Sequence, residues 1–312
     1  MPSSVTIDGP CEGASRTLWD DDSVSEVHAT TVSAVADGPP SDILYHHRVR
    51  FFAGMRELWG ARELVGTLTE RSLRSRYKQT FLGFAWSLIT PVTLMVVFTV
   101  FLRRVAKIDT GGIPYPIFSY VGLLPWSFFS SAVSSSSTVI LANNSLLNKI
   151  YCPREVFPIS AITAAMVDTA CAMVALFVLF IVNGYTPTGG VVWAPLLTII
   201  LVVFTLGVCL FLAGVTVYLR DLRYGVSIIL QLGLFATPVA YSLYAVVPGP
   251  WRGVYAAFNP LGPVIEGYRD TALLGHQPDF HLLGIAALSS IVWAIGGWIT
   301  FKKVEPGFSD VA

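Results

Sequence analysis

Charged residues are scarce in this sequence of 312 residues. Asp, Glu, Lys and Arg together make up 13% of the chain, while hydrophobic residues make up 54%. Soluble globular proteins carry about 25% charged residues. The deficit argues against an ordinary soluble domain, and its uneven distribution indicates where the chain crosses a membrane.

A nucleotide-binding loop is also missing. Such a loop ends in Gly-Lys-Ser or Gly-Lys-Thr, because glycine backbone N–H groups surround the phosphates and the lysine reaches them. The chain has five lysines, and none of them follows a glycine. If this protein moves a substrate with energy from ATP, another chain must bind the ATP.

Metal-binding and catalytic patterns are equally absent from the sequence. The four cysteines have no metal-ligand spacing, and His276 and His281 are five residues apart, which places them on different faces of a helix. The serines at 134–137 have no histidine or acid partner in sequence, so helix packing or a polar lining is the better interpretation. We therefore expect no metal, no cofactor held by this chain and no enzymatic activity.

Long uncharged runs are what the sequence has instead. No charged residue occurs at 79–102, 110–148, 169–219 or 224–251, and 280–301 contains one histidine. A membrane-crossing helix needs about 20 apolar residues, and continuous apolar runs favour helices over the alternating pattern of barrel strands. The longest run is divided at 183–190 by turn-forming residues.

We therefore predict an all-α integral membrane protein with six transmembrane helices. Their expected ranges are 83–102, 116–138, 159–182, 194–217, 226–246 and 282–301. An even number of crossings puts both termini on one side. That side has 11 Lys and Arg residues near the spans and the other side has 5, so the positive-inside rule predicts cytoplasmic termini.

Asp168 lies inside the third predicted span. A carboxylate within the membrane is costly and is a functional hypothesis by default. A proton relay would want further acids or histidines in other spans, and the sequence offers none. We expect Asp168 to form a structural pair or an interface contact.

The flanking segments differ in composition. Residues 1–42 contain eight acids and one base, which predicts a disordered acidic cytoplasmic tail over 1–47, either regulatory or simply solvated. Residues 48–80 have apolar residues at helical spacing among Arg and Glu, which predicts an amphipathic helix in the membrane interface or against a partner. The six-helix domain is expected over 81–305, with a cytoplasmic C-terminus at 306–312.

The last outer loop, 248–279, is long and contains two short apolar pieces at 254–258 and 264–268. The sequence Asn-Pro-Leu-Gly-Pro separates them. Each piece is too short to span a bilayer, so we predict a re-entrant helical hairpin on the outer face, before the last helix.

Several motifs carry a resemblance to a known family. Residues 71–91, 122–129 (Gly-Leu-Leu-Pro-Trp-Ser-Phe-Phe), 148–155 (Asn-Lys-Ile-Tyr-Cys-Pro-Arg-Glu), 218–224 and 259–261 resemble type-2 ABC transporter permeases of polysaccharide export, which include O-antigen, teichoic acid and galactan exporters. The resemblance covers about 55–305 in register and leaves the acidic tail outside.

This resemblance implies a permease that exports lipid-linked polysaccharide across the bacterial cytoplasmic membrane. Its partners would be a second copy of itself, two ATP-binding cassette subunits that hold ATP and Mg²⁺, membrane lipid and the polysaccharide, and no nucleic acid. The resemblance also implies site residues: an ATPase-coupling loop (Asn148, Lys149, Tyr151, Pro153, Arg154, Glu155), an aromatic channel lining (Phe84, Trp86, Trp126, Phe128, Phe129) and an outer gate (Tyr255, Phe258, Asn259, Pro260, Tyr268).

Alternatives remain for several of these assignments. Trp86 and Trp126 lie near span ends and fit lipid-facing interfacial anchors equally well, and Arg154 with Glu155 fits a surface ion pair of little energetic value. A type-2 permease for drugs or small lipids would share the fold. A membrane-embedded transferase would need paired acids or a histidine near a span end, and a secondary transporter would be expected to show internal repeats; we find neither pattern.

Overall fold

The computed structural model describes residues 60–77, 85–103, 112–143 and 152–308. All of them belong to the compact unit formed by Phe51–Ala312. The predicted acidic tail and the first part of the predicted amphipathic helix lie outside the described residues.

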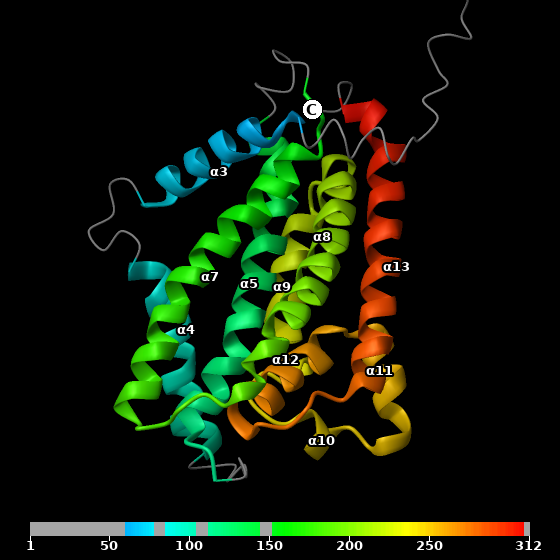
Figure 1. Cartoon of the computed structure of the whole chain (residues 1–312). Helices are drawn as coiled ribbons and strands as arrows, with labels where there is room; N and C mark the ends of the chain where they lie inside the picture. The colour runs from blue at the N-terminus through cyan, green and yellow to red at the C-terminus, as the bar shows by residue number, and fades with distance from the viewer. Residues whose placement is uncertain (1–59, 78–84, 104–111, 144–151, 309–312) are drawn as a thin grey trace, which may run out of the picture. The chain divides into compact units, whose positions relative to one another are not determined.

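Every regular element within the described ranges is helical, which confirms the predicted all-α class (Figure 1). The longer helices are α3 (Arg62–Tyr77), α4 (Ala85–Phe98), α5 (Tyr115–Ala142), α7 (Val156–Val182), α8 (Ala194–Tyr218), α9 (Leu222–Ala236) and α13 (Phe280–Val304). Short helices α10 (Leu243–Val246), α11 (Arg252–Phe258) and α12 (Leu261–Arg269) lie between α9 and α13. Single turns of 3-10 or π-helix extend or join them at Thr99–Arg103, Gly189–Trp193, Gly249–Trp251, Asp270–Leu274 and Glu305–Gly307.

Four of the described helical segments are long and apolar enough to cross a membrane. They are Tyr115–Ala142, Val156–Val182, Gly189–Tyr218 and Phe280–Gly307, at the positions predicted for the second, third, fourth and sixth spans. Shorter apolar helices at Ala85–Phe101 and Leu222–Ala236 occupy the positions of the first and fifth. The chain is therefore an integral membrane protein.

The predicted fifth span, 226–246, is wrong at its end. Helix α9 stops at Ala236, ten residues early, and Thr237 has extended backbone with ψ of 140°. Thr237 precedes Pro238, and a residue before proline is disfavoured in the helical region. The backbone then runs without regular structure to Ser242, so its carbonyls need partners other than a helix.

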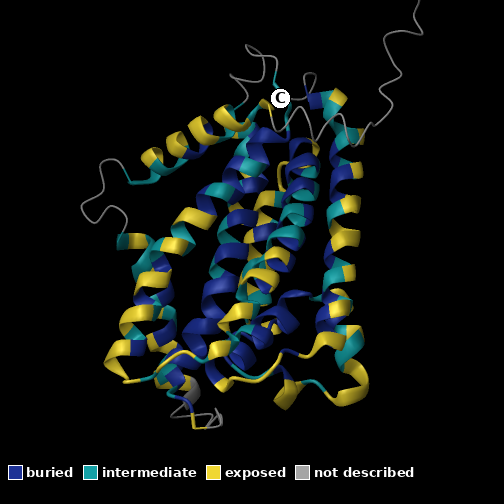
Figure 2. Ribbon diagram, viewed as in Figure 1, coloured by how far each residue is buried: buried dark blue, intermediate teal, exposed yellow. Residues whose placement is uncertain are grey.

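Helix α5 forms the centre of the bundle. It packs mainly against α7 and α8, and also against α4, α9 and α12. In the 18-residue apolar stretch of α5, 78% of the residues are buried, compared with 17% in that of α7 (Figure 2). Helices α7 and α13 expose large apolar side chains, such as Phe177, Ile181 and Ile291. Because the chain is an integral membrane protein, we assign these two faces to lipid.

Helices α8 and α13 form the most extensive helix pair among the described elements. Gly207 of α8 and Gly297 of α13 face each other, and a Cβ atom added to Gly297 would meet the Gly207 carbonyl. Because neither glycine has a side chain, the backbones of α8 and α13 can come into direct contact here. Small residues play the same role at other membrane helix interfaces.

Helix α3 lies against the beginning of α7 (Figure 1). Leu68 and Thr69 are buried there, and the Thr69 hydroxyl donates to the Ser160 carbonyl at 3.4 Å. Leu68 joins a second apolar cluster with Phe157, Trp298 and Phe301. The part of the predicted amphipathic helix that is described thus buries its apolar face on the bundle's own helices and exposes its charged face.

Candidate functional site

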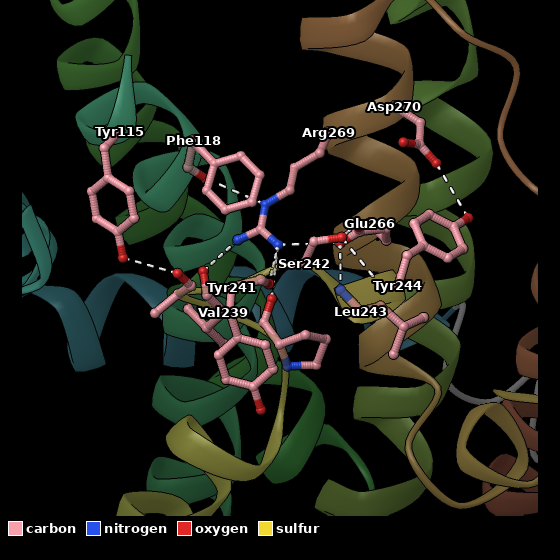
Figure 3. Close-up of polar contacts among 12 residues, drawn as sticks. Tyr115, Phe118, Val239, Tyr241, Ser242, Leu243, Tyr244, Glu266, Arg269 and Asp270 are labelled. Carbon is pink, nitrogen blue, oxygen red and sulfur yellow. Dashed lines mark hydrogen bonds and ion pairs between the residues drawn. The ribbon is translucent and has the colours of Figure 1, made fainter. Parts of the chain in front are cut away.

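Arg269, at the end of α12, is the largest fully buried side chain among the described residues, with 1% exposure. Its guanidinium lies 3.8 Å from the centre of the Phe118 ring of α5 (Figure 3). It donates hydrogen bonds to backbone carbonyls of Phe118 at 3.3 Å, Pro238 at 2.9 Å, Tyr241 at 2.8 Å and Val239.

These acceptors explain why the chain tolerates the interruption after α9. The carbonyls of Pro238, Val239 and Tyr241 come from the irregular segment, which cannot satisfy them internally. Buried backbone groups without partners cost free energy, and one guanidinium supplies donors to all three. The Tyr115 hydroxyl adds a fourth contact by donating to the Ala240 carbonyl at 2.9 Å.

Glu266 balances the buried charge of Arg269. Its carboxylate lies 3.2 Å from the guanidinium, accepts the Leu243 N–H at 3.3 Å and also accepts the Ser242 hydroxyl (Figure 3). A buried ion pair is tolerated only when hydrogen bonds satisfy its remaining atoms. Next to it, burial raises the pKa of Asp270 to about 6, and the Tyr244 hydroxyl donates to this carboxylate at 3.5 Å.

The residues predicted as an outer gate lie on α11, on α12 and at their junction. Asn259 donates to the Thr237 hydroxyl and to the Tyr255 hydroxyl, both at 2.9 Å, and Tyr255 donates to the Ala236 carbonyl at 2.9 Å. Tyr268 and Thr198 share a hydrogen bond of 2.7 Å. Pro260 is buried, while Phe258 is 83% exposed. The two predicted short pieces are therefore helical, and Tyr255 of the first bonds to the end of α9 while Tyr268 of the second bonds to α8. Their action as a gate stays a prediction.

Asp168 forms the structural pair expected from the sequence. Its carboxylate lies 3.0 Å from Arg76 and accepts the Tyr77 hydroxyl at 2.6 Å, both from α3. Arg76 also donates to the Ser135 hydroxyl of α5 at 2.7 Å. This cluster ties the last turn of α3 to α5 and α7, so Asp168 has a partner as expected, and its structural role stays a prediction.

Replacing Asp168 with alanine should lower the stability of the folded protein by about 1–3 kcal/mol, because two partly buried donors lose their acceptor. The matched control is Glu70→Ala, whose pair with Arg74 is exposed on both sides, and exposed pairs contribute about 0–1 kcal/mol. Thermal unfolding of the detergent-solubilised protein measures both. Equal losses of Tm in the two variants would refute a special role for Asp168.

The predicted coupling loop is described only from Cys152 onward, so Asn148, Lys149 and Tyr151 lie outside the described residues. Glu155 is 1% exposed and forms an ion pair with Lys302 of α13. Arg154 donates to the Glu305 carbonyl and lies 5.4 Å from the Phe308 ring centre. Arg154 and Glu155 therefore do not pair with each other, and both engage the C-terminal end of α13.

The predicted channel aromatics fall into two groups. Trp126, Phe128 and Phe129 are buried within this chain, where Phe129 stacks on Phe204 of α8 with ring centres 5.4 Å apart. Trp86 is 50% exposed, and Phe84 lies outside the described residues. A channel-lining role stays a prediction for all five, and among the described ones Trp86 has the most surface with which to contact cargo.

Helix α5 exposes a hydroxyl face that extends beyond the serines at 134–137, for which the sequence favoured helix packing or a polar lining. Ser134 and Thr138 are exposed, and Ser127, Ser130 and Ser131 are half-buried. Spacings of three, four and seven residues put these five on one side of a helix. A helical wheel of 122–142 would have shown the stripe, but not that it is the one uncovered side of an otherwise buried helix.

Comparison with known proteins identifies the family of this chain. A family model described as ABC-2 type transporter matches residues 63–273, which include α4 to α12 and with them the Arg269 network. The chain belongs to the ABC-2 type transporter family. As an ABC-2 family member it is a transport subunit of the membrane, and the recognition made from motifs is confirmed.

Curated relatives of this ABC-2 protein are similar over most of their length. The O-antigen export system permease protein RfbA of Myxococcus xanthus is 34% identical over 253 residues, covering 80% of this chain and 96% of the relative. A protein of the same name from Klebsiella pneumoniae is 28% identical, with 80% and 95% covered. The polysialic acid transport protein KpsM of Escherichia coli is 24% identical, with 77% and 93% covered.

Proposed function

We propose that this chain is the membrane subunit of an ATP-driven exporter that moves a lipid-linked polysaccharide across the bacterial cytoplasmic membrane. Its relatives are named for O-antigen export and polysialic acid transport. ATP would be bound by a separate ATPase, since none of the five lysines follows a glycine. A second copy of the chain would complete the path, with six spans per copy and cytoplasmic termini.

The hydroxyl face of α5 is the observation that carries the proposal. Against lipid, the oxygen lone pairs of these five hydroxyl groups would have no donor, and burial of an unsatisfied polar atom costs free energy. Ser130 and Thr138 donate to backbone carbonyls of their own helix at 3.3 and 3.2 Å, which leaves oxygen lone pairs to accept from sugar hydroxyls. Side chains this short fix no register, so a long polymer could slide past them.

A double substitution tests this surface. Ser134→Leu with Thr138→Leu should strongly reduce export while the protein still reaches the membrane, because the wall becomes apolar and narrower. Ala170→Leu, at an exposed position of α7, adds similar bulk toward lipid and should export normally. The measurement is polymer at the surface of cells whose own permease is deleted, co-expressing this chain and its companion ATPase.

The outcomes separate the candidates. Normal export by the double variant would contradict a role of α5 in the path. A wild-type chain that binds its companion ATPase yet restores no polymer would instead favour a cargo of another class, such as a drug or a small lipid.

A further inference from the structure

The beginning of α7 and the end of α13 are joined by charge. Glu155 precedes α7 and is 1% exposed, yet its side chain does not cap that helix. It pairs with Lys302, which also pairs with Glu305 at 2.9 Å. A carboxylate this buried needs its cation, so a movement of the loop before α7 would draw Lys302 with it.

Arg154 adds a second connection to the same end. Its guanidinium donates to the Glu305 carbonyl and lies over the Phe308 ring. Phe308 is buried and packs edge-on against Phe301 with ring centres 5.6 Å apart. Two adjacent residues of the predicted coupling loop therefore contact the last turn of α13 and the residues that directly follow it.

Helix α13 is well suited to carry a displacement along its length. Its 25 residues contain no proline, and at 1.5 Å per residue the helix is about 37 Å long. Contact between its Gly297 and Gly207 of α8 leaves no side chain that could yield, and the Tyr218 hydroxyl of α8 donates to the Val304 carbonyl at 3.1 Å. We expect α8 and α13 to move as one body.

The other end of α13 packs on the outer hairpin. Leu282 forms a buried cluster with Leu243 of α10 and Ala256 of α11. The Ser289 hydroxyl donates to the Ala257 carbonyl of α11 at 2.5 Å. One continuous helix thus contacts both the loop before α7 and the segment predicted to gate the outer face.

We propose that α13 transmits movement of the loop before α7 to the outer hairpin, and that the Glu155–Lys302 ion pair is the joint through which the loop acts on α13. This inference rests on the proposed function, because the ATPase is what would move the loop. It assigns Lys302 as a positioning residue that touches neither ATP nor cargo. The physical basis is the set of contacts at both ends of one rigid element, and coupling between them must be measured.

The experiment reads the hairpin directly. Phe258, 83% exposed on α11, is changed to cysteine, and the purified complex of permease and ATPase is labelled with a maleimide with and without ATP. The same complex without this cysteine gives the background from native cysteines. We expect ATP to change the labelling rate at position 258, and Lys302→Met to abolish that change while the ATPase still co-purifies.

Three further variants separate the ion pair from general damage. Lys302→Arg keeps the positive charge and should retain the response. Exchanging the charges with Glu155→Lys and Lys302→Glu should restore at least part of it. Lys303→Gln removes a neighbouring, exposed lysine and should respond like the parent.

Each outcome decides something. An unchanged ATP response in Lys302→Met, or no response in the parent complex, would overturn the proposal. Failure of any ATPase to co-purify would instead count against the proposed function. Polymer is absent from this assay, so the result does not depend on the identity of the cargo.

Discussion

Replacing Arg269 with alanine is expected to leave little folded protein in the membrane fraction. The substitution leaves Glu266 buried at 4% exposure without its cation, and breaking one partner of a buried pair costs about 3–5 kcal/mol. Carbonyls of Pro238, Val239 and Tyr241 lose their donor as well. Together these losses are comparable to the whole stability of a domain, about 5–15 kcal/mol.

Expression level and gel-filtration profile of a fluorescent fusion measure the effect. Arg252→Ala is the control, because Arg252 also donates to two carbonyls, those of Val247 and Tyr244, but it is only partly buried, so water can replace it. Arg269→Lys should rescue poorly, since an ammonium lacks the planar fork that reaches several acceptors. A monodisperse Arg269→Ala protein at parental yield would show that the network is dispensable.

Alanine at Gly297 and alanine at Gly296 should have effects of opposite sign. The Cβ of Gly297→Ala would meet the Gly207 carbonyl of α8, so the tightest contact of the α8–α13 pair must separate; overpacking of this kind costs about 1–3 kcal/mol. No heavy atom lies within 4 Å of a Cβ at Gly296. There, alanine should stabilise the helix by about 0.5–1 kcal/mol, the usual advantage over glycine.

Thermal unfolding in one detergent compares the two variants directly. The Tm of the parent should fall between the two values, with Gly297→Ala below it and Gly296→Ala above it. Similar Tm values for Gly297→Ala and the parent would mean that α8 and α13 separate without cost, and that would also weaken the case for α13 as a rigid transmitter.

Most helices could be located from the sequence because a membrane span needs about 20 apolar residues in a row. Uncharged runs predicted the second, third, fourth and sixth spans to within four residues of the helix ends, since each must satisfy its own backbone over a length set by the bilayer. The same logic identified Asp168 as a residue in need of a partner, although it could not name Arg76 or Tyr77, which are more than 90 residues away.

The same reasoning failed for the segment after α9 and for the outer hairpin that follows it. Hydropathy predicted a fifth span up to residue 246, but the backbone leaves the helical conformation after Ala236. Hydropathy does not detect such a break, because the freed carbonyls are satisfied by Arg269, which lies more than 25 residues further along the chain. Arg269 was counted among the outer charges of the positive-inside comparison, yet it is buried and paired. Its removal from that count strengthens the predicted orientation.

Site residues were harder to judge than helices. The coupling-loop motif singled out Arg154 and Glu155, but spacing could not show that Glu155 is buried against Lys302, 147 positions away. Charge reversal at Glu155 would place two lysines together, so it would disturb packing as well as coupling. Likewise, Trp126 and the hydroxyl face share α5, and only burial distinguishes the side turned inward from the uncovered side.

The order of the Arg269 network along the chain has a consequence for biogenesis. All backbone acceptors of this arginine, at positions 118, 238, 239 and 241, precede it in the sequence. During synthesis the receiving pocket therefore emerges from the ribosome before the guanidinium that fills it. A nascent chain that ends before α12 would therefore have three backbone carbonyls after α9 without the donor that satisfies them in the folded protein.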